Sequence, residues 1–131
     1  MIAINPPFSG NPPSETVVAR IRENAKANPE NCALVCGDAK VSWGELDTRI
    51  NKIANLLLSL GLRKGDNVAI LSPNSIAYAE LFLGILRAGG CVTPLSSMAS
   101  SLALHKMLSE CQPKAIFIAQ QYFELVSDFV Q

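Results

Sequence analysis

The sequence predicts an α/β fold, with an open, mainly parallel sheet built of βαβ units and an added N-terminal β-hairpin. Between Ser42 and Leu95, helices and strands follow one another with only short connections. The order is a capped helix, a Gly-Asp turn, an apolar strand, a second helix and a second strand. The strand at 68–71 is continuously apolar, as strands covered on both faces of a parallel sheet are. Strands that alternate with helices in this way are joined by right-handed crossovers.

The N-terminal segment differs in composition from the rest of the chain. Residues 1–13 are rich in proline, glycine and asparagine, which predicts an extended lead segment. We expect residues 14–131 to form one α/β unit, because a chain of this length has the size of a single domain. Ser14 is placed to cap the first helix, and Asn28-Pro29 to stop it. The predicted apolar stripe of this helix consists of Val17, Ile21 and Ala25.

A β-hairpin is predicted next, followed directly by the start of a helix. Mainly apolar runs at 33–36 and 40–43 flank a Gly-Asp pair at 37–38, which tolerates the positive φ of a tight turn. Ser42 and Glu45 have the spacing of a capping box, in which the hydroxyl and the carboxylate satisfy amides of the first turn. The second helix should therefore begin where the hairpin ends.

This second helix should be amphipathic and should end at a glycine. Its apolar positions recur at helical spacing, so that one stripe faces the core. Gly61 is placed to adopt the left-handed conformation that ends many helices, and Leu62 to fold back on the last turn. A turn at 64–66 then leads into the apolar strand. The predicted stripe consists of Leu46, Ile50, Ile53, Leu57 and Leu60.

The third helix, at 76–88, is apolar in nearly every direction. Glu80 and Arg87 are its only charged residues. A helix that is apolar all round is buried on more than the side that faces its sheet. Because one domain of this size offers little to cover a second side, we expect a surface outside these residues to cover it.

The remaining elements repeat the order of strand and helix. Glycines at 89–90 close the third helix, and the next strand, 91–95, is limited to an edge or an end of the sheet by Pro94. A serine-rich turn leads to a fourth helix, and 114–119 is a third parallel strand. Spacing assigns Phe123 to the core face. The fourth helix should bury Leu104, Met107, Leu108 and Cys111, and a last helical stripe should bury Tyr122, Leu125, Val126 and Phe129.

The cysteines and the single histidine do not indicate a metal site. Cys32, Cys36, Cys91 and Cys111 are expected at buried positions, where cysteine behaves as a small hydrophobic residue. Without the features of a secretion signal, we expect free thiols. The Cys-x3-Cys spacing has no second pair and no histidine partner beyond His105, which we expect to be a solvated surface residue.

Composition limits the classes of partner. Eleven Lys and Arg balance eleven Asp and Glu, so no global field favours nucleic acid or an anionic membrane. No apolar stretch approaches the roughly 20 residues of a membrane span. We therefore expect a cytoplasmic protein without nucleic-acid partners. The apolar share of 49% leaves self-association through exposed apolar surface open.

No recognisable catalytic motif is present. The sequence lacks both Gly-x-Gly-x-x-Gly and the Gly-x4-Gly-Lys phosphate loop, and no Ser or Cys nucleophile has a histidine base. We therefore predict no catalytic, cofactor-binding or metal-binding residue. A site in this chain would lie at the carboxyl ends of the parallel strands, in the loops 72–75 and 94–97. The alternative is that Asn74 or Ser75 simply caps its helix.

Several short motifs nevertheless stand in a characteristic order. They are Ser42-Trp43-Gly44-Glu45-Leu46, Ala54-x-x-Leu57, Gly61-Leu62-Arg63-Lys64-Gly65-Asp66-Asn67-Val68-Ala69, Arg87-Ala88-Gly89-Gly90 and Val92-Thr93-Pro94-Leu95. Each is weak alone, and the specificity lies in the ordered series. The series resembles the N-terminal region of the adenylate-forming superfamily, which includes acyl-CoA synthetases, aryl-CoA ligases, luciferases and peptide-synthetase adenylation domains. Trp43 departs from the tyrosine usual in that family.

The resemblance implies a two-step ligase. In such enzymes a carboxylate attacks the α-phosphate of ATP, with Mg²⁺, to give an acyl-adenylate, and a thiol, usually that of CoA, then displaces AMP. The family's phosphate loop and its mobile C-terminal domain lie downstream of the region matched here. The resemblance thus implies an incomplete fragment of a larger N-terminal domain, inactive alone. Its partners would be the rest of its parent chain and a small carboxylic acid, with ATP, Mg²⁺ and CoA used by the parent.

The alternative is a self-contained, non-catalytic α/β binding or regulatory module. A phospho-receiver domain is the obvious example, but the predicted strand ends at Ser72, Leu95 and Ala119 offer no acidic cluster for Mg²⁺. The coding sequence beyond Gln131 would separate the two hypotheses, because a ligase requires a Ser/Thr/Gly-rich loop ending in Pro-Lys soon after it.

Overall fold

The computed structural model describes residues 16–129, with elements in the order that the sequence predicts. The predicted lead segment 1–13, Ser14 and residues 130–131 lie outside the described residues. The helices are α1 (Val17–Ala27), α2 (Trp43–Ser59), α3 (Ile76–Arg87), α4 (Ser101–Cys111) and the 3₁₀ helix η1 (Gln120–Leu125). The strands are β1 (Cys32–Cys36), β2 (Ala39–Ser42), β3 (Asn67–Leu71), β4 (Cys91–Pro94) and β5 (Ala115–Ile118).

A three-stranded parallel sheet in the order β4-β3-β5 carries the core. Val68 of β3 lies opposite Val92 on one side and Ala115 on the other. Residues 68–71 of this central strand are fully buried, which confirms the prediction from their continuous apolar run. β4, with Pro94, lies at an edge of this sheet, as expected for a residue that has no N–H to donate.

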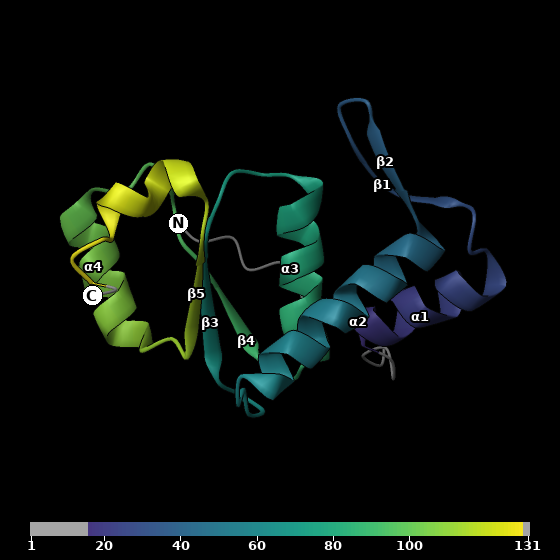
Figure 1. Ribbon diagram of the computed structural model, residues 1–131, viewed down its shortest axis with the longest axis horizontal. Coiled ribbons are helices and arrows are strands. Elements are labelled where there is room, and N and C mark those ends of the chain that lie inside the picture. Colours follow the sequence, from purple (N-terminus) through teal and green to yellow (C-terminus); the bar gives the residue numbers. More distant parts are fainter. Residues whose placement is uncertain (1–15, 130–131) are drawn as a thin grey trace, which may run out of the picture.

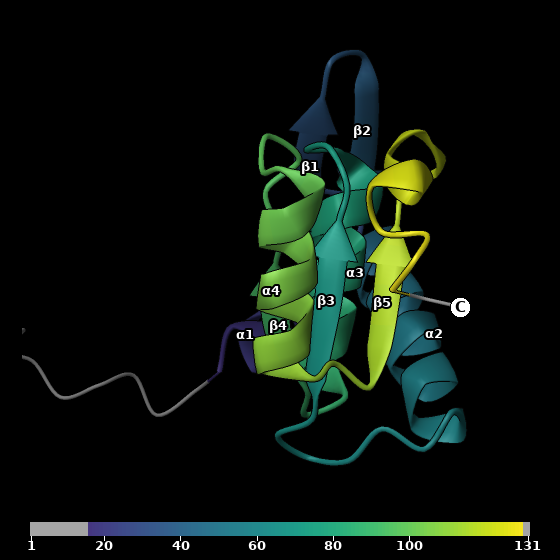
Figure 2. The same ribbon diagram turned by 90° about the vertical axis from the view of Figure 1, so that its left-hand side faces the viewer.

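Helices cover both faces of the sheet (Figure 1). In that view the sheet is seen edge-on, with α4 on one side, α3 on the other, and α2 and α1 beyond α3. Figure 2 shows α4 in front of the sheet and α3 behind it. The crossover from β3 to β4 and the crossover from β4 to β5 therefore run over opposite faces.

Part of the second side of α3 is covered by the chain itself. α2 packs along α3 so closely that a Cβ atom on Gly84 would lie 2.4 Å from Cγ2 of Ile53. Gly84 and Ile85 of α3 are buried, and its other large apolar side chains are half-buried. The prediction that a surface outside these residues covers the rest of α3 stays a prediction.

Arg87, at the end of α3, joins three helices. Its side chain is only 8% exposed, and Nη1 lies 2.7 Å from Oδ1 of Asp47 in α2. Nη1 donates to Oδ1 of Asn51 and Nη2 to the backbone oxygen of Val18, both at 2.9 Å. The contact with the Asp47 carboxylate is an ion pair rather than a directed hydrogen bond. Because a buried charge is tolerated only when it is paired, this network fixes how α1, α2 and α3 pack.

Both ends of α2 have the predicted chemistry. The Ser42 hydroxyl oxygen accepts a hydrogen bond from the Glu45 backbone N–H at 3.3 Å, and the Glu45 carboxylate accepts one from the Ser42 N–H at 2.9 Å. This is the complete capping box. At the other end, Gly61 has a φ of 86°. The N–H of Leu62 then donates to the oxygen of Leu57 at 3.0 Å, which returns the chain toward the sheet.

α1 and the hairpin lie on the side of the molecule away from α4 (Figure 1). The cap of α1 is Thr16 and not Ser14, because the Thr16 hydroxyl oxygen accepts a hydrogen bond from the N–H of Ala19 at 3.2 Å. β1 and β2 pair antiparallel around the predicted turn. Ile21 of α1 and Val41 of β2 are buried with the N-terminal half of α2 in a separate core cluster.

Four apolar side chains on predicted core-facing stripes are exposed. Val17 is 55%, Leu60 64%, Met107 43% and Phe123 47% exposed. Val17 is the first residue of α1. Leu60 lies at the end of α2, after the last turn that packs on the sheet. Met107 is one step around α4 from Leu108, which is buried. Phe123 lies in a 3₁₀ helix, whose repeat of three residues turns it away from the face expected from a repeat of 3.6.

The cysteines are less buried than predicted. All four are free thiols, as expected, but Cys32, Cys36 and Cys91 are exposed and Cys111 is half-buried. The prediction treated each strand as a covered strand. Instead, β1 belongs to a two-stranded hairpin, and Cys91 is the first residue of an edge strand.

Candidate functional site

The carboxyl ends of β3 and β5 form a topological switch point. β3 leads into α3 on one face of the sheet, whereas β5 leads into η1 on the face that carries α4 (Figure 2). Val126, the residue after η1, is buried together with Leu104 and Leu108 of α4. The chain thus leaves two neighbouring strands in opposite directions. Open α/β sheets bind ligands in the crevice that such a divergence creates.

A pocket of about 220 Å³ lies at this position; we call it the strand-end pocket. Its walls come from the residue after β3, from α3 and from the end of β5. Rings of Tyr78 and Phe117 also pack against the core cluster that contains Ile70, so the fold holds these walls in place. None of the lining residues is charged. They are Ser72, Ala77, Tyr78, Leu81, Phe117, Ile118 and Ala119.

The two loops expected at this edge have different roles. Ser75 caps α3, since its hydroxyl oxygen accepts a hydrogen bond from a first-turn amide at 3.0 Å. Ser72 lines the strand-end pocket, and its hydroxyl donates to the adjacent Pro73 oxygen at 3.3 Å. In the loop 94–97, Leu95 is buried, and its backbone N–H donates to the backbone oxygen of Ile70 in β3 at 2.8 Å. That loop does not contribute to the strand-end pocket.

Sequence reasoning missed the wall that β5 supplies, residues 117–119. It placed a candidate site in the loops that follow β3 and β4, and it considered Ala119 only as a strand end without an acidic cluster. In the structure β5 is the other neighbour of β3. The available signal was that both 68–71 and 114–119 read as parallel strands, whose carboxyl ends lie at one edge of a sheet.

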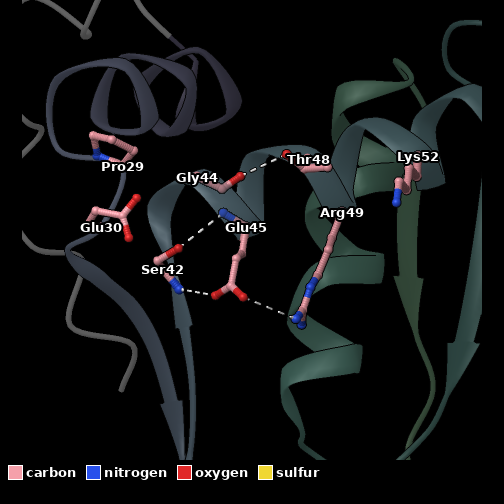
Figure 3. A pocket seen from close by; sticks show the side chains of 8 residues that line it. All are labelled: Pro29, Glu30, Ser42, Gly44, Glu45, Thr48, Arg49 and Lys52. Carbon is pink, nitrogen blue, oxygen red and sulfur yellow. Dashed lines mark hydrogen bonds and ion pairs between the residues drawn. The ribbon is translucent and has the colours of Figure 1, made fainter.

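A larger, open hollow of about 530 Å³ lies beside the N-terminus of α2 (Figure 3). Of its charged lining residues, Arg49 lies 3.9 Å from Glu45 and 2.8 Å from Glu80 of α3, which does not line the hollow. The other two charged lining residues are Glu30 and Lys52. The hydrogen bond from the Ser42 amide holds the pKa of Glu45 below its usual value. The bond to Glu80 raises the pKa of Arg49. These groups cap α2 and join it to α3, and we assign no ligand to the hollow.

The described residues contain no group of three or more His, Cys, Asp or Glu side chains that could hold a metal ion. His105 is half-buried rather than solvated, with its ring centroid 6.1 Å from that of Phe129 and its Nε2 atom buried without a hydrogen-bond partner. The prediction of a surface histidine is wrong because the C-terminal segment folds over α4. Within 16–129, the helices are too short or too polar to cross a membrane.

Comparison with known proteins identifies the family. Residues 21–130 match the family described as AMP-binding enzyme. The chain is 34% identical over 91 residues to malpinin synthetase of Mortierella alpina, covering 70% of this chain and 1% of that protein. It is 29% identical over 98 residues to the long-chain-fatty-acid–CoA ligase FadD13 of Mycobacterium tuberculosis, covering 73% and 20%. Among solved structures, ATP-bound MatB from Rhodopseudomonas palustris matches with a TM-score of 0.76 and 27% identity, covering 85% and 22%.

In each of these matches the chain spans less than a quarter of the related protein. The match with MatB is a match of three-dimensional structure over 85% of this chain. The family match begins within α1 and extends past the last helix. Both agree with the resemblance that the ordered motifs carry. The chain therefore belongs to the AMP-binding enzyme family.

Proposed function

We propose that this chain forms the N-terminal α/β part of an ATP-dependent acid–CoA ligase and is inactive alone. The parent enzyme would convert a carboxylic acid and ATP into an acyl-adenylate and then into a CoA thioester, in the cytoplasm. The observation that carries this proposal is the family match over 21–130, together with a relative named as a long-chain-fatty-acid–CoA ligase. At 29% identity that relative supports the reaction class and not the acyl substrate.

The described residues do not suit the phosphates of ATP or a Mg²⁺ ion. The strand-end pocket is lined without any charged side chain, and 16–129 contain no acidic cluster for a metal. Burying the phosphates of a nucleotide there would leave their charge unpaired. The chain's own contribution is therefore a scaffold. The buried central strand β3 and the helices packed on it hold the carboxyl ends of the strands in place.

A direct test uses calorimetric titration of the chain with ATP and Mg²⁺. We expect no binding at micromolar ATP, since the strand-end pocket has no charged lining residue and 16–129 contain no acidic cluster for Mg²⁺. Micromolar affinity would contradict the proposal that the nucleotide site lies elsewhere. Sequencing the gene past the codon for Gln131 is the companion test. A Ser/Thr/Gly-rich loop ending in Pro-Lys supports a ligase parent, and its absence removes that support.

One observation favours the second candidate, a self-contained, non-catalytic α/β module. α2 of the same chain already packs along α3 and buries Gly84 and Ile85. The two candidates differ in what the chain does with a downstream segment. For a ligase, mixing this chain with the separately produced downstream part should restore carboxylate-dependent ATP–pyrophosphate exchange. A chain that folds but never restores exchange would favour the module.

A further inference from the structure

Two independent observations meet at the strand-end pocket. The first is topological: the chain leaves β3 and β5 toward opposite faces of the sheet, which is where open α/β folds bind ligands. The second is the pocket of about 220 Å³ between Tyr78 and Leu81 of α3 and Phe117 of β5. Ser75 caps α3 and does not line this pocket, so helix capping does not account for the lining residues. The lining can therefore be considered as a binding site.

The lining defines the chemistry of an occupant. Leu81, Phe117 and Ile118 present apolar surface, and the hydroxyls of Ser72 and Tyr78 are the polar side-chain groups. An anionic or cationic ligand would find no opposite charge among the lining side chains to compensate the hydration that it gives up. The volume lies below the roughly 300–1,000 Å³ of pockets that hold drug-sized ligands. A nucleotide is thus too large and too charged, whereas one ring fits in size and polarity.

We propose that the strand-end pocket binds a single uncharged, ring-sized apolar group, in contact with Tyr78 and Phe117 and with the Ser72 hydroxyl oxygen as an acceptor. This goes beyond the proposed ligase function, because binding belongs to the chain itself and requires neither ATP nor a parent enzyme. An aromatic ring gains by burial against the two aromatic side chains. A helix or a strand of a protein partner would need a longer groove than this pocket provides.

The test is a titration of the whole chain with benzyl alcohol, followed by amide chemical shifts in ¹H–¹⁵N NMR spectra. We expect saturable shifts at Tyr78, Leu81 and Phe117 in the millimolar range, because one ring buries little surface. Benzoate has the same ring with a negative charge, and we expect it to leave these signals unchanged. Equal binding of benzoate, or shifts located elsewhere, would overturn the proposal. So would shifts at these residues that depend on protein concentration alone, which would indicate a second copy in the pocket.

Variants locate the binding without relying on shifts alone. Ala77→Leu adds a side chain at an exposed helix position that lines the pocket, and it should weaken benzyl alcohol binding about tenfold or more by occupying that volume. Ala27→Leu makes the same change at the exposed end of α1 and should leave binding unaltered. Unchanged affinity in A77L would contradict the proposal. Should A77L not fold, as judged by circular dichroism, contacts between probe and Tyr78 protons in NOE spectra of the wild type decide, and their absence overturns it.

Discussion

Arg87 and Asp47 show how one ion pair constrains the packing of several helices. Their side chains are 8% and 20% exposed, so neither charge is well hydrated. We expect Arg87→Met to lower the free energy of unfolding by about 3 kcal/mol, because Asp47, which is 20% exposed, would remain poorly hydrated without its partner. The backbone oxygen of Val18 would also lose its donor. Urea unfolding followed by circular dichroism measures this loss.

The matched control is Arg49, which pairs with Glu80 at nearly the same distance of 2.8 Å. The Arg49 side chain is 45% exposed, although that of Glu80 is only 12% exposed, so water screens the pair from the arginine side. Arg49→Met should therefore cost less than Arg87→Met. Equal losses in the two variants would show that burial does not set the strength of these pairs.

Glu45 gives the chain a dependence of stability on pH. Its pKa in the folded chain is lowered, first by the hydrogen bond from the Ser42 amide. A carboxyl group with a lowered folded pKa stabilises the fold above its unfolded pKa, and this stabilisation is lost as the pH falls through the folded value. Glu45→Gln keeps an acceptor for the capping box but cannot titrate. The difference in urea midpoint between wild type and E45Q should therefore shrink from pH 7 to pH 3, and a constant difference would contradict this assignment.

Among the elements, the crossing of α2 over α3 depends on Gly84. Glycine in a helix interior usually costs about 1 kcal/mol relative to alanine, so propensity alone predicts that Gly84→Ala stabilises. The added Cβ atom would, however, lie 2.4 Å from Cγ2 and 2.7 Å from Cβ of Ile53. We expect a net loss of about 1–3 kcal/mol from overpacking. Ile53→Ala removes Cγ2 but keeps Cβ, so in that background the same substitution should cost less. An equal loss in both backgrounds of this cycle would exclude the Cγ2 contact as its main cause.

Element periodicity explains which features the sequence predicts and which it does not. The stripe of α2 is confirmed at Leu46, Ile50 and Leu57, which are buried, because a long helix repeats every 3.6 residues. The same spacing fails at Leu60 and Phe123. The first lies at a helix end, and the second lies in a 3₁₀ helix. Local repeats predict burial only where the helix type is regular and continues past the residue.

For the whole molecule, local sequence predicts the strands but not their spatial order. The apolar run at 68–71 identifies a central strand, yet nothing in it specifies that β5 becomes its second neighbour. The same gap hid the packing of α2, which lies earlier in the chain, along α3. For the same reason the sequence predicts only part of the strand-end pocket. Ser72 directly follows β3, whereas Phe117 reaches the pocket only because β5 pairs with β3. Long-range placement depends on the sum of all packing contacts, which no single motif encodes.

The outer surface of α2 should make the chain self-associate. Leu56 and Leu60, one turn apart, are 52% and 64% exposed, and a formal net charge of zero provides little repulsion between copies. We expect the apparent mass in light scattering to rise with concentration, and Leu56→Gln with Leu60→Gln to abolish the rise, because paired apolar surface is removed. Leu102→Gln makes the same change on α4, at a side chain that is 81% exposed, and should not abolish it. A rise that persists in the α2 double variant and disappears in L102Q would place the contact on α4 instead.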